Sequence, residues 1–316
     1  MYKGSKNAIA EWVYSHFPVR DNFYDLFAGG CAITQRALIM QQFKRYFCND
    51  IDGDGIKLFL NAINGEYDNE NRWISREDFF RLKDSDPYVK YAWSFGNNGR
   101  DYLYGKDIEP YKKAWHYAIF FHDYKPAEEL GLDLKSIEPI GNIYDRYIAT
   151  KRITEQSYDE NISRYQVYER QQQLEALNRL QSLQSLQSLQ SLQSLQSLQS
   201  LQSLQSLQSL RLDYAQVNIL PNSLIYCDIP YKNTNAYGNK NINSFDYERF
   251  YSWCEKQTEP VIISEYEMPR NRFICIDEIE KSVMMNSGAD QKTIERLFVP
   301  KHQEGIIKVW KQGELF

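Results

Sequence analysis

Apolar residues in the first part of the chain alternate between helical and extended spacing. Residues 8–16, 33–41 and 55–63 carry apolar positions at helical spacing, which predicts three helices. Residues 22–27 and 46–50 are short β-prone runs, the first followed by a glycine turn and the second ending in an acid. This order of strand, glycine turn, helix, strand and acid is that of a βαβ nucleotide-binding unit.

The strand pattern returns near the other end of the chain. Residues 223–227 form an apolar run that ends at Asp228, and 260–264 and 272–276 predict two more buried strands. We therefore expect an α/β fold in which one sheet begins before residue 65 and is completed after residue 213.

The intervening sequence has a different composition. Residues 66–172 are rich in Tyr, Trp, Asn, Asp and Lys and contain glycine turns, which predicts an α-rich lobe or a long functional loop. The expected division is one α/β domain from 1–65 and 213–316, with the insertion 66–172 and a repeat segment 173–212 between its two parts.

The repeat segment contains ten successive Leu-Gln-Ser triplets over residues 180–209. A period of three matches neither the strand period of 2 nor the helix period of 3.6. On an α-helix the leucines would drift by about −60° per triplet, which argues against a long two-stranded coiled coil. Residues 165–180 favour a helix, and Leu and Gln are reasonable helix formers, so we expect a long helix that acts as a spacer. A β-solenoid-like or disordered array is the alternative.

Composition and charge narrow the possible functions. The 316 residues include 24 Tyr and 16 Phe, side chains that stack on bases but also fill protein cores. The net charge of −5 argues against a protein that coats DNA through a basic face. It leaves room for an enzyme that touches DNA through one local patch.

Several site types find no support in the sequence. The five cysteines form no C-x-x-C pair and the four histidines are scattered, so no metal site is predicted. The beginning of the sequence lacks an apolar signal region, and no run of about 18 apolar residues occurs. We therefore expect a soluble, cytoplasmic protein with reduced thiols and no membrane contact.

A carboxylate and an aromatic ring follow the apolar run 223–227. Asp228 stands at the carboxyl end of this predicted strand, where open α/β sheets bind ligands. Asp228 and the carbonyl of Ile229 could accept both N–H bonds of an aromatic amine and point its nitrogen lone pair at a methyl donor. Pro230 stiffens the turn, and Tyr231 offers a face on which an extruded base could stack. The alternative is an acid that merely caps a turn.

The glycine turn after residues 22–27 is a candidate cofactor loop. Glycines let the main chain approach a ligand, and the following helix N-terminus favours negative charge. Asp50, at the end of the next strand, stands where an acid grips ribose hydroxyls. The candidate cofactor residues are Asp25, Phe27, Ala28, Gly29, Gly30 and Asp50. The pattern leaves open whether the cofactor is a dinucleotide or a methyl donor.

Taken in order, these segments resemble the DNA adenine methylase (Dam) family in its α arrangement of motifs. That family has a Gly-x-Lys motif, a cofactor glycine loop, a ribose acid, a target-recognition insert and an Asp-Pro-Pro-Tyr motif. The matching segments are Gly4-Ser5-Lys6, 25–30, Asp50, 66–172 and 228–231. The resemblance adds Lys6 and Asp213 to the candidate cofactor residues, with Asp213 at the acid that contacts the cofactor adenine.

The resemblance implies a Rossmann-like methyltransferase fold with S-adenosyl-L-methionine as cofactor. The implied reaction is methyl transfer to the N6 amine of an adenine flipped out of duplex DNA. Duplex DNA is then the partner, and a monomer is the expected state. The chain departs from the family at Cys31, which replaces the third glycine of the loop, and at Ile229, which replaces the first proline of the catalytic motif. Activity is expected to survive because Ile229 also presents a carbonyl.

Residues 94–106 are the best candidates for contacting DNA. Asn pairs with adenine and Arg with guanine in the major groove, while Lys contacts phosphate. The residues selected on this basis are Asn97, Asn98, Arg100, Tyr102 and Lys106. A polar surface hairpin without a DNA role is the alternative.

Three other functions stay open at this stage. The chain could be a catalytically degenerate relative that binds DNA or nucleotides. It could be a Rossmann-type enzyme that uses another nucleotide cofactor such as NAD, which would leave 228–231 unexplained. It could also be a non-catalytic interaction protein whose working part is the triplet array.

Overall fold

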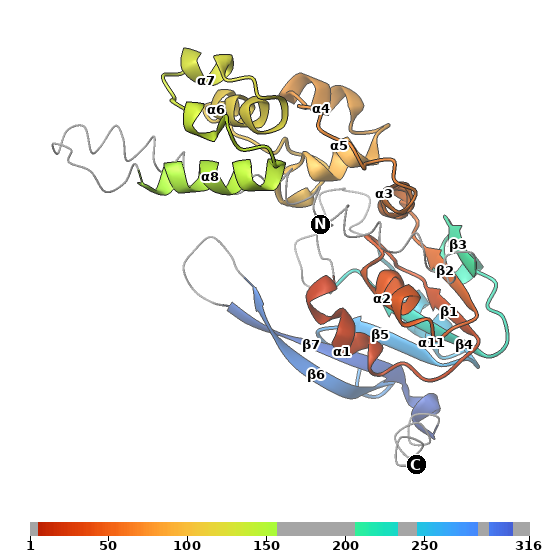
Figure 1. The fold of residues 1–316 in the computed structure, drawn as a ribbon. Coiled ribbons are helices and arrows are strands. Elements are labelled where there is room, and N and C mark those ends of the chain that lie inside the picture. The colour runs from red at the N-terminus through yellow and green to blue at the C-terminus, as the bar shows by residue number, and fades with distance from the viewer. Residues whose placement is uncertain (1–5, 157–205, 233–244, 284–290, 306–316) are drawn as a thin grey trace. The chain divides into compact units, whose positions relative to one another are not determined.

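The protein is described by a computed structural model that covers residues 6–156, 206–232, 245–283 and 291–305 (Figure 1). The chain forms two compact units. The first consists of Met1–Gly65 with Ser194–Phe316, and the second is Glu66–Gln193.

The first unit is built on a seven-stranded sheet. Its strands are β1 (Asn22–Asp25), β2 (Arg45–Asn49), β3 (Leu207–Leu210), β4 (Ser223–Asp228), β5 (Val261–Glu265), β6 (Phe273–Val283) and β7 (Gln291–Pro300). They lie in the order β3-β2-β1-β4-β5-β7-β6. Strands β1 to β5 run parallel, whereas β7 is antiparallel to both β5 and β6. This mixed sheet fits the Rossmann-like fold that the sequence predicted, and it brings the carboxyl ends of the parallel strands to one edge.

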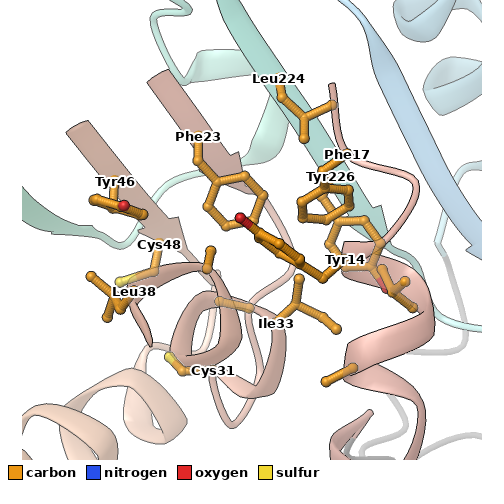
Figure 2. Close-up of a cluster of buried hydrophobic side chains, with 14 of the residues drawn as sticks. Tyr14, Phe17, Phe23, Cys31, Ile33, Leu38, Tyr46, Cys48, Leu224 and Tyr226 are labelled. Carbon is orange, nitrogen blue, oxygen red and sulfur yellow. The ribbon is translucent and has the colours of Figure 1, made fainter. Parts of the chain in front are cut away.

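Helices cover both faces of this sheet (Figure 1). The first unit contains η1 (Asn7–Ile9), α1 (Ala10–Tyr14), α2 (Ala32–Met40), α3 (Asp54–Ile63), η6 (Tyr214–Gln216), α11 (Tyr247–Cys254) and η7 (Lys301–Gln303). Side chains from α1, α2 and α3 pack with one face of the strands, as Figure 2 shows for Ile33 beside Phe23 and Tyr226. The adjacent residues on β1 and β4, Tyr24 and Ile225, point to the opposite face and pack with α11. The period-2 alternation of strands therefore supplies two cores.

The last triplet of the repeat is a strand, which corrects the expected helix and the expected boundary at residue 212. Leu207–Leu210 pairs in parallel with β2 along the edge of the sheet. Residues three apart in a strand point to opposite faces, and Leu207 indeed packs on one core while Leu210 packs on the other. Pairing with β2 therefore outweighs the helix propensity of Leu and Gln. Residues 157–205, with the other triplets, lie outside the described residues.

The described part of the second unit is helical. Its helices are α4 (Arg76–Leu82), α5 (Pro87–Ala92), η2 (Phe95–Asn97), α6 (Glu109–His116), η3 (Tyr117–Phe121), α7 (Lys125–Glu129), η4 (Lys135–Ile137) and α8 (Ile143–Gln156). Side-chain caps start two of them: Ser75 accepts the Asp78 amide, and Asp86 accepts the amides of Tyr88 and Val89.

Within the described ranges, none of the helices has the length and apolar character needed to cross a membrane.

Candidate active site

Carboxylates gather at the edge where the parallel strands end. Asp25 ends β1, Asp228 ends β4, Glu265 ends β5, and Asp50 follows β2 directly. Burial raises the pKa of each of these carboxyl groups, that of Asp25 to about 7. Burying several acids together is unfavourable unless a cation compensates them. The edge is therefore suited to positively charged groups.

The ammonium group of Lys6 lies among these acids. Its Nζ atom is 3.1 Å from Asp228 Oδ1 and 2.9 Å from Glu295 Oε1. It also donates to the Tyr231 hydroxyl, which in turn donates to Glu295. Burial would lower the pKa of Lys6, but the charges of Asp228 and Glu295 outweigh burial and raise it well above its usual range. Lys6 is therefore a fixed positive charge within the site.

Asp228 keeps part of its side chain open to a ligand. Its side chain is 21% exposed, against 6% for Lys6 and 2% for Glu295. Burial raises the pKa of Asp228, and Lys6 acts against this shift. The Lys6 ion pair engages Oδ1, so the exposed part of the carboxylate can accept a further hydrogen bond.

The turn after Asp228 is anchored by packing and hydrogen bonds. Ile229 is buried in the core that faces α11. The Pro230 carbonyl accepts a hydrogen bond of 2.8 Å from the Tyr247 hydroxyl, and the amide of Lys232 donates to Glu265 Oε1 at 2.6 Å. The buried Ile229 side chain therefore anchors the turn.

Tyr231 is held beside a second aromatic ring. The Lys6 Nζ atom is 4.4 Å from the centroid of the Tyr231 ring, within cation–π range. The Tyr266 ring, directly after β5, lies 4.5 Å from it at an interplanar angle of 58°. Both tyrosines are half-buried, so aromatic surface remains open at the end of β4 and β5.

The glycine turn is closed by the acid that the sequence paired with it. Asp50 accepts the Gly29 amide at 2.9 Å through Oδ2 and the Asp52 amide at 2.9 Å through Oδ1. Gly29 has a φ of 49° and Cys31 a φ of 59°, the left-handed conformation that glycine adopts most easily. Ala28, Gly30 and Cys31 complete the turn into α2, and the Cys31 amide donates to the Ala28 carbonyl at 2.6 Å.

Asn49 supports this loop and was not recognised from the sequence. Its side-chain amide donates to the carbonyls of Leu26 and Leu212 at 3.1 and 3.0 Å, and its Oδ1 atom accepts the Leu212 amide. The side chain therefore ties together the chain segments that leave β1, β2 and β3. A buried Asn at a strand end is the signal that could have identified it.

Asp25 lies beneath the loop with one oxygen unmatched. It is 1% exposed, and its Oδ2 atom accepts a hydrogen bond of 2.7 Å from the Thr34 hydroxyl. Within the part of the chain that the structure describes, Oδ1 has no hydrogen-bond partner. A buried unpaired oxygen is costly and commonly marks a site where a ligand or water binds.

Asp213 and Phe27 lie beside the α11 core. Both carboxylate oxygens of Asp213 are bound by Arg249, at 2.9 and 2.8 Å. The Phe27 ring packs 5.4 Å from that of Tyr214 and 5.8 Å from that of Phe250. Arg249 must therefore share or release Asp213 before that acid can contact a cofactor.

The candidate DNA-binding residues fall in the second unit and separate into two groups. Asn97 is buried and donates to the Tyr91 carbonyl at 2.7 Å, and Tyr102 is buried and donates to the Ile74 carbonyl at 2.7 Å. Asn98 accepts the amides of residues 100 and 101, a local turn contact. Asn97, Asn98 and Tyr102 therefore shape the loop. The side chains of Arg100 and Lys106 are exposed and form the second group.

Comparison with known families adds evidence that is independent of the geometry. No curated protein matches the chain. Across the described residues, no cluster of His, Cys, Asp and Glu is arranged to hold a metal ion. The model of the D12 class N6 adenine-specific DNA methyltransferase family matches residues 2–116, which include Lys6, the glycine turn and Asp50. Over these residues the chain is similar to the D12 class N6 adenine-specific DNA methyltransferases.

Proposed function

We propose that the protein transfers a methyl group from S-adenosyl-L-methionine to the N6 amine of an adenine that is flipped out of duplex DNA. The observation that carries this proposal is the position of Asp228. This acid ends β4 beside the glycine turn of β1, is paired with Lys6, and keeps an exposed part of its carboxylate. A partly exposed carboxylate next to a nucleotide-type loop can accept a hydrogen bond from an amine that is held near a bound methyl donor.

The residues at this edge fit such a cofactor. When bound, S-adenosylmethionine supplies an electrophilic methyl group on a positively charged sulfonium. Asp25, Asp50 and Asp228 present carboxylates at the same edge, and the unmatched Oδ1 atom of Asp25 lies beneath the turn. Gly29 keeps the main chain of the turn accessible. Asp50, which accepts the Gly29 amide, would also accept a hydrogen bond from a ribose hydroxyl. We infer that Lys6, Asp25, Asp50 and the turn 27–30 line the cofactor site.

Asp228 and the main chain of the turn would act on the target amine. The amino group of adenine is a weak nucleophile because its lone pair is delocalised into the ring. Hydrogen bonds from its N–H groups to Asp228 and to the Ile229 carbonyl would favour a lone pair on nitrogen that points away from both acceptors. Lys6 lowers the pKa of Asp228 against the effect of burial and so favours the ionised form, which accepts rather than donates a hydrogen bond. Tyr231 provides the stacking surface for the flipped base.

DNA contact would come in part from the second unit. Arg100 and Lys106 are exposed cations in the loop region 94–106. Because the whole chain carries a net charge of −5, phosphate binding must depend on such local groups. We propose Arg100 for base or phosphate contact and Lys106 for phosphate contact, with Asn97, Asn98 and Tyr102 shaping the loop that presents them.

The decisive experiment uses a donor with a trideuterated methyl group. The protein is incubated with this donor and with unmethylated duplex DNA of varied sequence, and the nucleosides are analysed by mass spectrometry. The proposal predicts trideuterated N6-methyladenine. Label on cytosine N4, or label on no base although the donor binds in calorimetry, would contradict it. Binding of NAD in place of S-adenosylhomocysteine would instead support a Rossmann-type enzyme with another cofactor.

A further inference from the structure

A buried glutamate on β7, the strand that follows β5 in the sheet, contacts the candidate site. Glu295 is 2% exposed, its Oε1 atom is 2.9 Å from Lys6 Nζ, and it accepts the Tyr231 hydroxyl. We infer that Glu295 is a positioning residue for methyl transfer. It holds the Tyr231 hydroxyl and the Lys6 ammonium, and through them it orients the Tyr231 ring and the Asp228 carboxylate. This inference rests on the proposed function of Asp228 and Tyr231.

The topology of the sheet explains how Glu295 reaches the site. β7 is antiparallel to β5, and Arg296 pairs with Glu265 at the last position of β5. Glu295 therefore lies just beyond the carboxyl end of β5. Strand alternation places Glu295 on the same face as Leu297 and Val299, both buried in the core with α1 and α2. An acid occupies a strand position that packing alone would fill with an apolar side chain.

The contacts of Glu295 favour a role in the site over a purely structural one. A buried carboxylate is a poor choice for strand stability, because its desolvation commonly cancels the attraction of its ion pair. Both contacts of Glu295 described above are with residues that we place at the methyl-transfer centre. Without Glu295, Lys6 would have Asp228 as its one ion-pair partner among the described residues, and it could draw that carboxylate out of line with the base. Because the Lys6 ammonium pairs with Glu295 as well as with Asp228, the turn after β4 is held in a defined position.

Two substitutions of Glu295 test the inference. Glu295→Gln keeps the shape and an acceptor oxygen but removes the charge, and Glu295→Ala removes both. We expect kcat for methyl transfer to fall about tenfold in the Gln variant and about a hundredfold in the Ala variant, since misplacement by about 1 Å has effects of that size. The dissociation constant of S-adenosylhomocysteine should change by less than kcat does, because Glu295 reaches the proposed cofactor site through Lys6 and not through the glycine turn.

The matched control is Leu297→Ala, on the same face of β7. It should lower the unfolding temperature through loss of core packing and leave kcat unchanged at temperatures where the protein is folded. A loss of kcat in Leu297→Ala equal to that in Glu295→Gln would overturn the inference, because both would then act through the stability of the strand.

A pH profile gives a readout that a structural role would not move. Asp228 is surrounded by Lys6, Glu295, Tyr231 and Tyr226, with Asp25 nearby on β1. The charge of Glu295 raises the pKa of Asp228, so its removal should lower that pKa. The acid limb of kcat should therefore move to lower pH in Glu295→Gln and stay in place in Leu297→Ala. An unmoved limb in both variants would overturn the inference.

One measurement is independent of catalysis. In protein labelled with ¹³C at the tyrosine ζ-carbon, the Tyr231 resonance is identified by its loss in Tyr231→Phe. It should shift in Glu295→Gln and stay in place in Leu297→Ala. If the wild type methylates no DNA, the proposed function fails, yet this shift still decides whether Glu295 holds Tyr231. A Tyr231 resonance unaffected by Glu295→Gln overturns the inference whatever the activity.

Discussion

The Lys6 ammonium lies 3.1 Å from Oδ1 of Asp228, although the two residues are far apart in the sequence. Burial alone would raise the pKa of Asp228 and favour its protonated form, whereas Lys6 lowers that pKa. A protonated Asp228 would carry an O–H donor on one of its two oxygens. The carboxyl group could then not accept a hydrogen bond at both oxygens, one from Lys6 and one from a target amine. The ion pair therefore links the beginning of the chain to the protonation state of the candidate catalytic acid.

Removing the charge of Lys6 should change the pH range of activity. In Lys6→Gln the pKa of Asp228 rises further, because the adjacent positive charge that lowers it is lost. Activity requires the ionised acid and is lost as the pH falls through this pKa, so the acid limb of kcat/KM moves to higher pH. Lys6→Arg should restore part of the range. Lys44→Gln, which removes an exposed ion pair with Asp21, serves as the control. An acid limb unmoved in Lys6→Gln would contradict this role of the pair.

Asp25 should make stability depend on pH. Burial raises its pKa to about 7 in the folded protein, whereas an unfolded Asp titrates near 3.9. The folded state therefore binds the proton more tightly. This contribution to stability is fully present below about pH 4 and is lost as the pH rises through about 7.

Asp25→Asn removes this dependence while keeping an acceptor for Thr34. Relative to wild type, the variant should gain more stability at pH 8 than at pH 5, by no more than about 4 kcal/mol. Chemical denaturation at both pH values measures the difference. Asp21→Asn, at an exposed acid whose pKa Lys44 lowers, should show no such gain. An equal effect of Asp25→Asn at pH 5 and pH 8 would show that Asp25 is ionised in the folded state at both values.

The two groups of loop residues in the second unit should behave differently on substitution. Arg100→Ala and Lys106→Ala should each weaken DNA binding and reduce the slope of log affinity against log salt by about 1, with no change in stability. Tyr102→Phe loses the hydrogen bond to the Ile74 carbonyl and should cost about 1 kcal/mol of stability, with an unchanged salt slope. A double variant of Arg100 and Lys106 with wild-type affinity and slope would exclude this loop from the DNA interface.

The triplet array should be dispensable except at its end. Deleting residues 180–203 leaves β3 intact, so the unfolding temperature of the first unit and the methylation rate should not change. Extending the deletion through residue 210 removes the edge strand and should lower that temperature. Leu207→Ala and Leu210→Ala, each partly buried on a different core, should cost about 1–2 kcal/mol apiece. Loss of folding in the shorter deletion would mean that the upstream triplets contribute to the fold.

The elements predicted correctly from the sequence have local signals. The strands at 22–27 and 223–227 and the helix at 33–41 were recognised because apolar runs and glycine turns mark their ends. β3 and β7 were missed because they depend on partners distant in sequence. The Gln and Ser side chains of β3 give no strand pattern, and its stability comes from pairing with β2.

The candidate site was predictable only in part for the same reason. Asp228 and Asp50 stand at strand ends, where local sequence already indicates a ligand. Glu295 joins the site through strand pairing, and Arg249 reaches Asp213 from α11, neither of which leaves a local trace. Asn97 was predicted to read a base, but it has a φ of 54° and its side chain donates to the Tyr91 carbonyl. The sequence alone does not distinguish an Asn that stabilises a turn from an Asn that contacts DNA.

The most direct test of the central claim is a single-turnover methylation assay with Asp228→Asn. The substitution keeps the size of the side chain but removes the charge. One of the two carboxylate oxygens is replaced by an NH₂ group, which donates instead of accepting. We predict a fall of about a hundredfold or more in the rate of N6-methyladenine formation, with the affinity for S-adenosylhomocysteine and the unfolding temperature close to wild type. Asp21→Asn, at the exposed acid paired with Lys44, should methylate DNA at the wild-type rate. A wild-type rate in Asp228→Asn would contradict the assignment of Asp228 as the acid that activates the adenine amine.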